Sequence, residues 1–280
     1  MSLHRSIATV LGMPRVNMSL TRGAVACGLR TIDLTAPDTW EFSGFSQNGE
    51  DGILDVLCRQ LLRPNRYFVE IGAGDGTENN TTWLALVHRY SGLWIEGNRR
   101  KSRRCRALFS RLADGAATVP MFVTTDSIPA LMQRVREHQP DVFSLDMDGV
   151  DFHIAQAFFA HGLRPRICVV EYNASFGPDM RVTVPYDARF RATRGHGNNL
   201  YFGCSIAAWR SVFEPLGYRF VTVDRNGVNA FFVDATAVLP AFLAAVRGCP
   251  YRESFVRIKG YGHDWKRQWE LIASRPYVQL

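Results

Sequence analysis

Residues 67–76 decide the fold, and they read Tyr-Phe-Val-Glu-Ile-Gly-Ala-Gly-Asp-Gly. Tyr67–Ile71 has the composition of a buried strand, and three glycines follow it at alternate positions. Residues 81–88 then have the spacing of a helix. In a strand–glycine–helix arrangement the backbone can turn sharply and approach a ligand, close to the free N–H groups and positive dipole end of the helix. This segment therefore predicts a ligand-binding turn at the edge of a sheet.

The rest of the chain continues the alternation of strand and helix. Further strands are expected at 92–96, 117–123, 141–145 and 166–171, and helices at 101–112, 128–138, 150–161 and 205–216. This alternation of strands and helices predicts a mostly parallel sheet with both faces covered by helices. Two more strands, 218–223 and 228–233, flank Asn226-Gly227, a strong hairpin signal, so they are expected to be antiparallel neighbours at a sheet edge. The predicted class is α/β, a Rossmann-like three-layer sandwich with a mostly parallel seven-stranded sheet and an antiparallel C-terminal hairpin.

Composition excludes several classes of protein. The chain has 280 residues, 46% of them hydrophobic and 21% charged, which is ordinary for a globular protein and excludes a disordered chain, a collagen or a coiled-coil rod. The most apolar stretch, 231–246, contains Asp234 and Pro240, so a membrane-spanning helix is not expected. The six cysteines form no Cys-x-x-Cys pair, and a reducing, cytoplasmic location is the simplest expectation.

The glycine turn distinguishes between two kinds of cofactor. Thr77 stands where a dinucleotide-binding Gly-x-Gly-x-x-Gly motif needs its third glycine. Instead, Glu70 with Gly72, Gly74 and Gly76 resembles the first motif of methyltransferases that use S-adenosylmethionine (SAM). That resemblance implies that the Glu70 carboxylate faces the amino-acid end of SAM. In either cofactor family, a carboxylate at the end of the next strand accepts the ribose hydroxyls of an adenosine.

Four more residues, together with Asp146 after the fourth strand, complete the expected cofactor site. Glu96 ends the second strand, 20 residues after Gly76, and is expected to bind the ribose. Asp126 and Ser127 follow the third strand, where this architecture contacts adenine, although a helix N-cap explains them equally well. Asn79, in the extended glycine loop, is a further expected cofactor contact.

A second set of polar residues follows the fourth and fifth strands. Asp146, Asp148 and Glu171 are expected to converge at the carboxyl ends of these strands, where open α/β sheets bind ligands. Three hard oxygen ligands suit Mg²⁺, Mn²⁺ or Ca²⁺, and such an ion can hold two vicinal sugar hydroxyls and lower the pKa of one of them. Helix capping by Asp148 and Asp151 without a metal is the alternative.

The order of the motifs resembles that of the FkbM-type SAM-dependent methyltransferases. The resemblance runs through residues 45–52, 68–80, 92–98, 146–151 and 170–171. It implies O-methylation of a hydroxyl of a sugar, glycan or glycosylated metabolite, with SAM as cofactor. This chain departs from the family in its longer glycine loop and in reading Asp-x-Asp-Gly-x-Asp after the fourth strand, where Asp-x-Glu-Gly-x-Glu is usual. The shorter side chains reduce the reach of these groups.

The expected organisation follows from this resemblance. We expect an N-terminal basic extension (1–45), a methyltransferase domain (46–245) with a lid or substrate loop at 174–204, and a C-terminal extension (246–280) packed on the domain. The N-terminal extension has no acidic residue before Asp33, which is typical of a transit peptide or of a basic arm that lies on a partner or a membrane surface.

Three residues are candidates for catalysis. His196 lies between two glycines in the loop and can act as a general base near neutral pH, with His153 as the competing base. Asp146 is the third candidate, through a metal-bound alkoxide.

Alternatives from other classes remain open. The net charge of +7 and the basic run at 99–106 suggest an RNA or other nucleic acid methyltransferase. The absence of an Asn/Asp-Pro-Pro-aromatic motif after the fourth strand disfavours methylation of an adenine amino group, and a nucleic acid partner is not favoured. A non-catalytic subunit with the SAM fold, and a nicotinamide oxidoreductase, are further alternatives. The expected partner is a small-molecule or glycan acceptor, and peripheral membrane contact and a homo-oligomer stay open.

Overall fold

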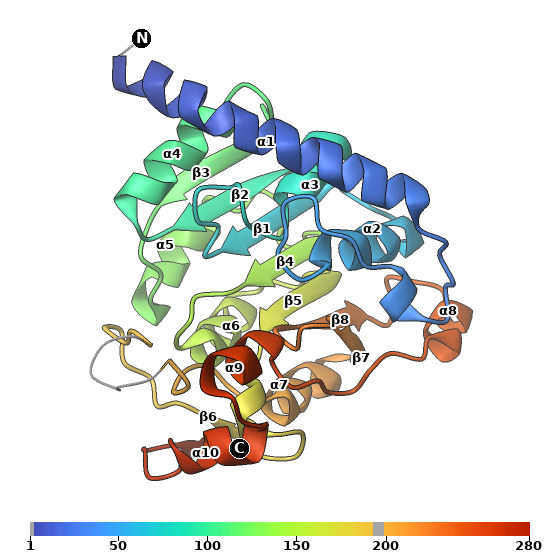
Figure 1. The fold of residues 1–280 in the computed structure, drawn as a ribbon, viewed down its shortest axis with the longest axis vertical. Helices are drawn as coiled ribbons and strands as arrows, with labels where there is room; N and C mark the ends of the chain where they lie inside the picture. Colours follow the sequence, from blue (N-terminus) through green and yellow to red (C-terminus); the bar gives the residue numbers. More distant parts are fainter. Residues whose placement is uncertain (1–2, 193–198) are drawn as a thin grey trace.

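The chain folds around one seven-stranded sheet (Figure 1). The computed structural model describes residues 3–192 and 199–280 and, within the first helix, the side chains from Gly12 onward. The strands follow the order β3-β2-β1-β4-β5-β8-β7. Their bounds are β1 (Tyr67–Ile71), β2 (Ser91–Glu96), β3 (Ala116–Pro120), β4 (Val142–Leu145), β5 (Ile167–Glu171), β7 (Tyr218–Val223) and β8 (Asn229–Asp234). β8 runs antiparallel to both of its neighbours, whereas the other pairs in the sheet are parallel. The predicted fold class is confirmed.

The antiparallel hairpin forms where the sequence predicts it. β7 and β8 are joined by a turn in which Asp224 accepts the N–H groups of Asn226, Val228 and Asn229. Gly227 has φ +67°, and a Cβ there would lie 2.5 Å from the carbonyl oxygen of Glu253. The turn therefore needs both the aspartate and the glycine, and it inserts β8 between β5 and β7.

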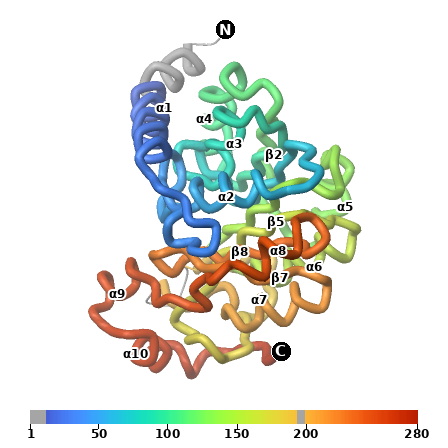
Figure 2. The backbone as a smooth tube through the Cα atoms, turned by 90° about the vertical axis from the view of Figure 1, so that its right-hand side faces the viewer, coloured from blue at the N-terminus to red at the C-terminus, as the bar shows by residue number. Residues whose placement is uncertain are grey.

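Helices cover both faces of the sheet, as Figures 1 and 2 show. Their bounds are α1 (Leu3–Leu29), α2 (Glu50–Gln60), α3 (Thr82–Val87), α4 (Arg99–Phe109), α5 (Ile128–Met132), α6 (Asp151–Ala160), α7 (Ile206–Phe213), α8 (Pro240–Ala245), α9 (Phe255–Tyr261) and α10 (Trp265–Glu270). One buried apolar cluster joins the sheet to α5, α6 and α7. A second cluster joins the opposite face to α1, α2, α3, α4 and α8. β1 is buried at every position because it lies between these two layers.

The N-terminal segment is a helix that packs against the domain, which the sequence analysis did not predict. Val16 of α1 is fully buried, and a Cβ on Gly12 would lie 2.4 Å from the side chain of Leu108 on α4. Arg22 donates to the carbonyl oxygen of Gly44 at 2.6 Å. Arg15 and Arg30 form ion pairs with Glu78 and Asp55, so these three described arginines bond to the body of the protein. Within the described chain, no helix combines the length and the apolar character that crossing a bilayer requires.

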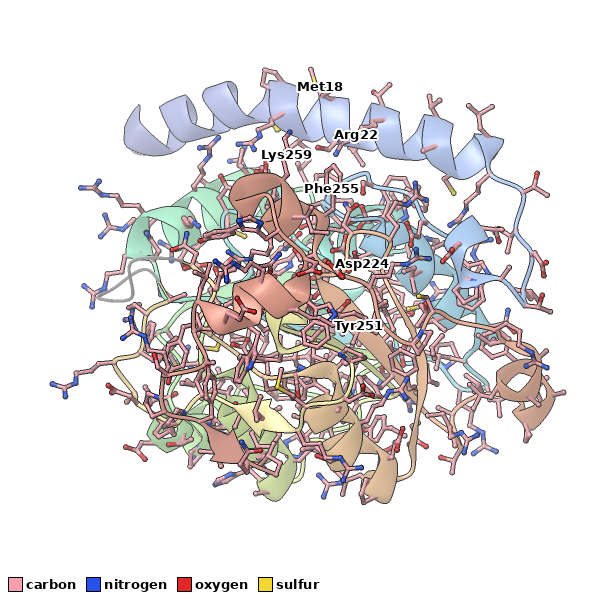
Figure 3. The ribbon with its side chains drawn as sticks, turned by 60° about the horizontal axis from the view of Figure 1, so that its bottom comes forward. Met18, Arg22, Asp224, Tyr251, Phe255 and Lys259 are labelled. Carbon is pink, nitrogen blue, oxygen red and sulfur yellow. The ribbon has the colours of Figure 1, made fainter. Side chains whose placement is uncertain are left out.

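The predicted loop at 174–204 contains a short strand that joins it to the C-terminal segment. β6 (Val182–Thr183) pairs antiparallel with β9 (Val278–Gln279). Tyr251 donates to the carbonyl oxygen of Ala174 at 2.7 Å, and Ser175 donates to Gln268 at 2.7 Å. The strand pair and these two hydrogen bonds thus join the loop to the C-terminal segment. Figure 3 shows Phe255 and Lys259 on α9 and, above them in that view, Met18 and Arg22 on α1.

Two predicted elements are shorter than expected. The helix predicted for 128–138 ends at Met132, because the N–H groups of Arg134 and Val135 bond to carbonyl oxygens three residues back and tighten the chain into turns. The strand predicted for 117–123 ends at Pro120, the residue that pairs with the last residue of β2. The remaining predicted strands and helices differ from the observed bounds by at most a few residues.

Candidate active site

A cavity of about 390 Å³ lies at the carboxyl ends of β1, β2 and β4, and we call it the main cavity because the predicted site residues surround it. Such crevices are where open α/β sheets bind ligands, and the volume falls within the usual range of about 300–1,000 Å³ for small-molecule sites. Its lining residues are Ile71, Gly72, Ile95, Glu96, Gly97, Asn98, Lys101, Met121, Phe122, Val123, Asp146, Met147, Asp148 and Arg191. The predicted site residues Gly72, Glu96, Asp146 and Asp148 therefore lie around one cavity.

Glu96 is held in a fixed orientation by the glycine turn. Its two carboxylate oxygens accept the backbone N–H of Gly74 at 2.8 Å and of Asn98 at 2.5 Å. A carboxylate has about four acceptor positions, so two remain for a ligand. Gly74 has φ +60°, and no described heavy atom lies within 4 Å of where its Cβ would be. The backbone beside Glu96 therefore leaves room for a close approach.

Two of the other glycines serve packing. Gly72 has φ +86°, and a Cβ there would lie 1.7 Å from the carbonyl oxygen of Asp146. Gly76 has φ +78°, and its Cβ would lie 2.5 Å from the ring of Phe109. Gly72 thus lets the ends of β1 and β4 approach each other, which places Asp146 at the cavity.

The structure places Glu70 and Asn79 apart from the predicted cofactor position. Side chains alternate along a strand, so Glu70 lies on the α3 side of the sheet. Its carboxylate accepts the Asn79 side-chain N–H at 2.9 Å, the Asn80 backbone N–H at 2.8 Å and the Thr81 hydroxyl at 2.5 Å. Burial raises the pKa of Glu70 to about 7, although these hydrogen bonds favour the charged carboxylate and act to lower the pKa. Both Glu70 and Asn79 are buried and, in the described part of the chain, neither lines the main cavity.

The acidic cluster forms as the sequence predicts. One carboxylate oxygen from each of Asp146, Asp148 and Glu171 lies within 4.8 Å of the other two. Burial, followed by the negative charge of neighbouring carboxylates, raises the pKa values of Asp146 and Glu171 well above the usual range. The positive charge of Arg257 on α9 opposes the shift at Glu171. The Oε2 atom of Glu171 is buried without a hydrogen-bond partner among the described atoms.

Asp151 and Asp148 have different surroundings. Asp151 accepts the backbone N–H groups of Met147 and Gly149 at 2.8 and 2.9 Å, so it holds the turn before α6. Asp148 is exposed and has φ +52°, a left-handed conformation that is uncommon outside glycine, asparagine and aspartate. The turn thus presents the Asp148 side chain to the cavity while Asp151 fixes the backbone.

Sequence reasoning missed the structural part played by residues 44–51. The carboxylate of Asp51 accepts three consecutive N–H groups, from Gly44, Phe45 and Ser46. Glu50 accepts the side-chain N–H of Asn229 at 2.8 Å, and Asn229 pairs with Glu171 across β8 and β5. This segment therefore holds a polar network behind the acidic cluster. The Gly-Glu-Asp triplet at 49–51 was the available signal.

The other predicted residues lie away from the cavity or outside the described residues. His153 Nε2 lies 2.9 Å from the carbonyl oxygen of Val184, and this contact leaves Nδ1 for other partners. Ser127 forms a reciprocal capping box with Thr124. Asp126 is part of the same short helical turn, and the described lining of the cavity includes neither it nor Ser127. His196 lies outside the described residues.

Two cavity residues were not singled out from the sequence. Phe122 follows β3, and the guanidinium of Arg191 lies 3.8 Å from the centre of its ring. Arg191 comes from the predicted lid, so the lid contributes to the cavity wall. Lys101, from the first turn of α4, adds a second positive group. The basic run at 99–106 was visible in the sequence, but its division between two sides of a helix was not.

The fold and the site together define a Rossmann-like α/β protein with a polar cavity at the carboxyl ends of its strands. No protein-family model matches the sequence, and no curated protein does. Several solved structures are distantly similar. An O-methyltransferase from Bacillus cereus in complex with S-adenosylhomocysteine (SAH) is 14% identical, over 78% of this chain and 89% of that one, with a TM-score of 0.43.

Two other solved structures are similar to the same degree. The O-methyltransferase TomG from Streptomyces achromogenes, in complex with SAM, is 17% identical over 78% of this chain and 96% of that one, with a TM-score of 0.43. A SAM-dependent methyltransferase from Geobacter sulfurreducens, in complex with SAH, is 15% identical over 71% and 70%, with a TM-score of 0.40. These likenesses are distant.

Proposed function

We propose that the protein is a SAM-dependent methyltransferase. The observation that carries the proposal is the position of Glu96, whose carboxylate lines the main cavity with two acceptor positions free. Two ribose hydroxyls would occupy those positions. The single antiparallel strand β8 supports the same assignment, because plain dinucleotide-binding folds keep their sheets parallel.

Different cavity residues would contact different parts of the cofactor. Glu96 would hold the ribose, the backbone at Gly72 and Gly74 would lie along the ligand, and Phe122 and Val123 would provide an apolar wall for adenine. SAM supplies a methyl group that is already activated on a sulfonium, so the protein chiefly orients the acceptor and excludes water. In this proposal Glu70 acts indirectly, by holding the 79–81 segment.

The acceptor would be a hydroxyl of a sugar, glycan or glycosylated metabolite. The motif order supports this acceptor, as does the acidic cluster beside the cavity. Asp146, Asp148 and Glu171 fit a hard divalent cation such as Mg²⁺ or Mn²⁺, because each offers an oxygen and the buried Oε2 of Glu171 has no partner among the described atoms. Such an ion would supply charge that lowers the pKa of a bound hydroxyl. The carboxylates themselves can orient that hydroxyl and accept its proton.

The experiment is transfer of a labelled methyl group from SAM to a panel of sugars and glycans, with Mn²⁺ and with EDTA. Asp148→Asn is the informative variant, because asparagine tolerates the left-handed backbone and keeps the size of the side chain. We expect D148N to lose at least about tenfold in transfer, as for other residues that act in proton transfer. SAM affinity should stay unchanged. Asp179→Asn, on the exposed surface, is the matched control. Full transfer by D148N would contradict the assigned role of the cluster.

A further inference from the structure

α4 carries an unusual concentration of positive charge. Six of its residues from Arg99 to Arg106 are lysine or arginine, and the sequence holds no acidic residue from Gly97 to Ala113. Two of the six lie in or beside the proposed methyl-transfer site. Lys101 lines the main cavity, and Arg104 forms an ion pair with Asp75 of the glycine loop at 3.2 Å.

Three other arginines face a second, separate hollow. Arg99, Arg103 and Arg106 are spaced four and three residues apart, so they lie along one side of the helix. They line a pocket of about 250 Å³ where α4 crosses the edge strand β3. Ser102, Thr118 and Pro120 complete its lining. Figure 1 shows α4 beside β3 at the end of the sheet. We call this hollow the arginine pocket.

The arginine pocket is separate from the main cavity although the two are close. Asn98 and Met121 line the main cavity, whereas their chain neighbours Arg99 and Pro120 line the arginine pocket. The start of α4 and the end of β3 thus form the wall between them. A ligand in the arginine pocket would lie near the cofactor site without entering it.

The three guanidinium groups have no protein counter-charge in the described parts of the chain. Each is exposed, and no ion pair among the described residues includes any of the three. Like charges three or four residues apart on a helix repel one another. Arg99 also stands in the first turn, where the helix dipole disfavours a positive charge. Both effects would be relieved by a bound anion.

We propose that the arginine pocket binds a compact cluster of phosphates, such as a pyrophosphate or triphosphate group. Arginine presents a planar fork of donors that matches phosphate oxygens in pairs. Three arginines around one concave pocket suit a small, highly charged group. A nucleic acid backbone would instead need a track of basic residues longer than this pocket. The proposal does not depend on methyl transfer, because none of the three arginines lines the main cavity.

Calorimetric titration tests the proposal. The full chain is titrated with inorganic pyrophosphate and inorganic triphosphate at constant ionic strength, and with a short single-stranded RNA. The variants are R103A and R103A/R106A. The matched control is R63A/R219A, which removes two exposed arginines that no ion pair among the described residues includes.

We expect pyrophosphate or triphosphate to bind the wild-type protein. R103A should weaken that binding about tenfold, the range for a charged hydrogen bond, and R103A/R106A should weaken it further. The control should bind like the wild type. Three outcomes would overturn the proposal: no binding of either phosphate, equal weakening in the control, or RNA binding without phosphate binding. The exposed positions make misfolding of these variants unexpected, and a thermal melt of each variant checks this.

Discussion

An alanine substitution at Gly74 distinguishes an effect on ligand affinity from an effect on folding stability. The φ of Gly74 is +60°, and no described heavy atom lies within 4 Å of where a Cβ would stand. Gly162, in the loop after α6, has φ +91° and equally open surroundings. Alanine in a left-handed conformation costs about 1–2 kcal/mol. We therefore expect Gly74→Ala and Gly162→Ala to lower the free energy of unfolding by about this same amount.

The two variants should differ in ligand binding. Gly74 donates its N–H to Glu96 at 2.8 Å, and a methyl group at Gly74 would occupy the open space in which we place the ligand. Overfilling a well-packed contact costs about 1–3 kcal/mol, which corresponds to a loss of about 5- to 150-fold in affinity. The loop at Gly162 lies next to the amino end of β5, away from the cavity. G162A should therefore bind SAH as the wild type does.

The assay is calorimetric titration of SAH into each variant, beside urea unfolding of the same preparations. Wild-type SAH affinity in G74A would refute the placement of the ligand along the glycine turn. A loss of affinity in G162A as large as in G74A would show that backbone strain, rather than contact with the ligand, is responsible.

Three further predictions concern stability. Gly72→Ala should lower the free energy of unfolding by at least about 3 kcal/mol in urea unfolding, because its Cβ would stand 1.7 Å from a backbone oxygen of Asp146 that cannot move aside. Burial raises the pKa of Asp51 from 3.8 to about 7, so between these values the folded state holds a proton that the unfolded state has lost, and stability falls as pH rises through 7. From about pH 5.5 to about pH 8.5 this loss should be about 2 kcal/mol in pH-dependent melts, and Asp51→Asn should flatten it. Arg30→Ala breaks a buried ion pair with Asp55 and should lower the free energy of unfolding in urea by about 3 kcal/mol. The loss stays at this low end because Asp55 keeps its other partners, Arg59 and His88. A loss under about 1 kcal/mol would show that the ion pair adds little to stability.

Periodicity and turn residues were enough to predict the sheet. The strand composition of Tyr67–Ile71, the repeated alternation and the Asn226-Gly227 turn each describe local structure, and local structure determined the layers and the hairpin. α1 was missed because its prediction requires long-range packing. Pro14 and three glycines weaken its intrinsic helix preference, and it is buried against Leu108 and Trp83, which lie far along the chain.

Several of the predicted site residues lie together in the structure, and others do not. Glu96, Asp146, Asp148 and Glu171 come together because the carboxyl ends of parallel strands meet at one edge. Glu70 was assigned from a motif, although the alternation of side chains directs it to the α3 side of the sheet. The division of the basic run into a cavity side and a pocket side depends on how α4 lies against β3.

The most direct test of the central claim is calorimetric titration of SAM, SAH and NAD into the full chain, and into Glu96→Ala. We expect one-to-one binding of SAM and SAH. We also expect at least about a tenfold loss of affinity in E96A, because that variant lacks the charged acceptor that we assign to the two ribose hydroxyls. Binding of NAD in preference to SAH, or wild-type SAH affinity in E96A, would contradict this assignment.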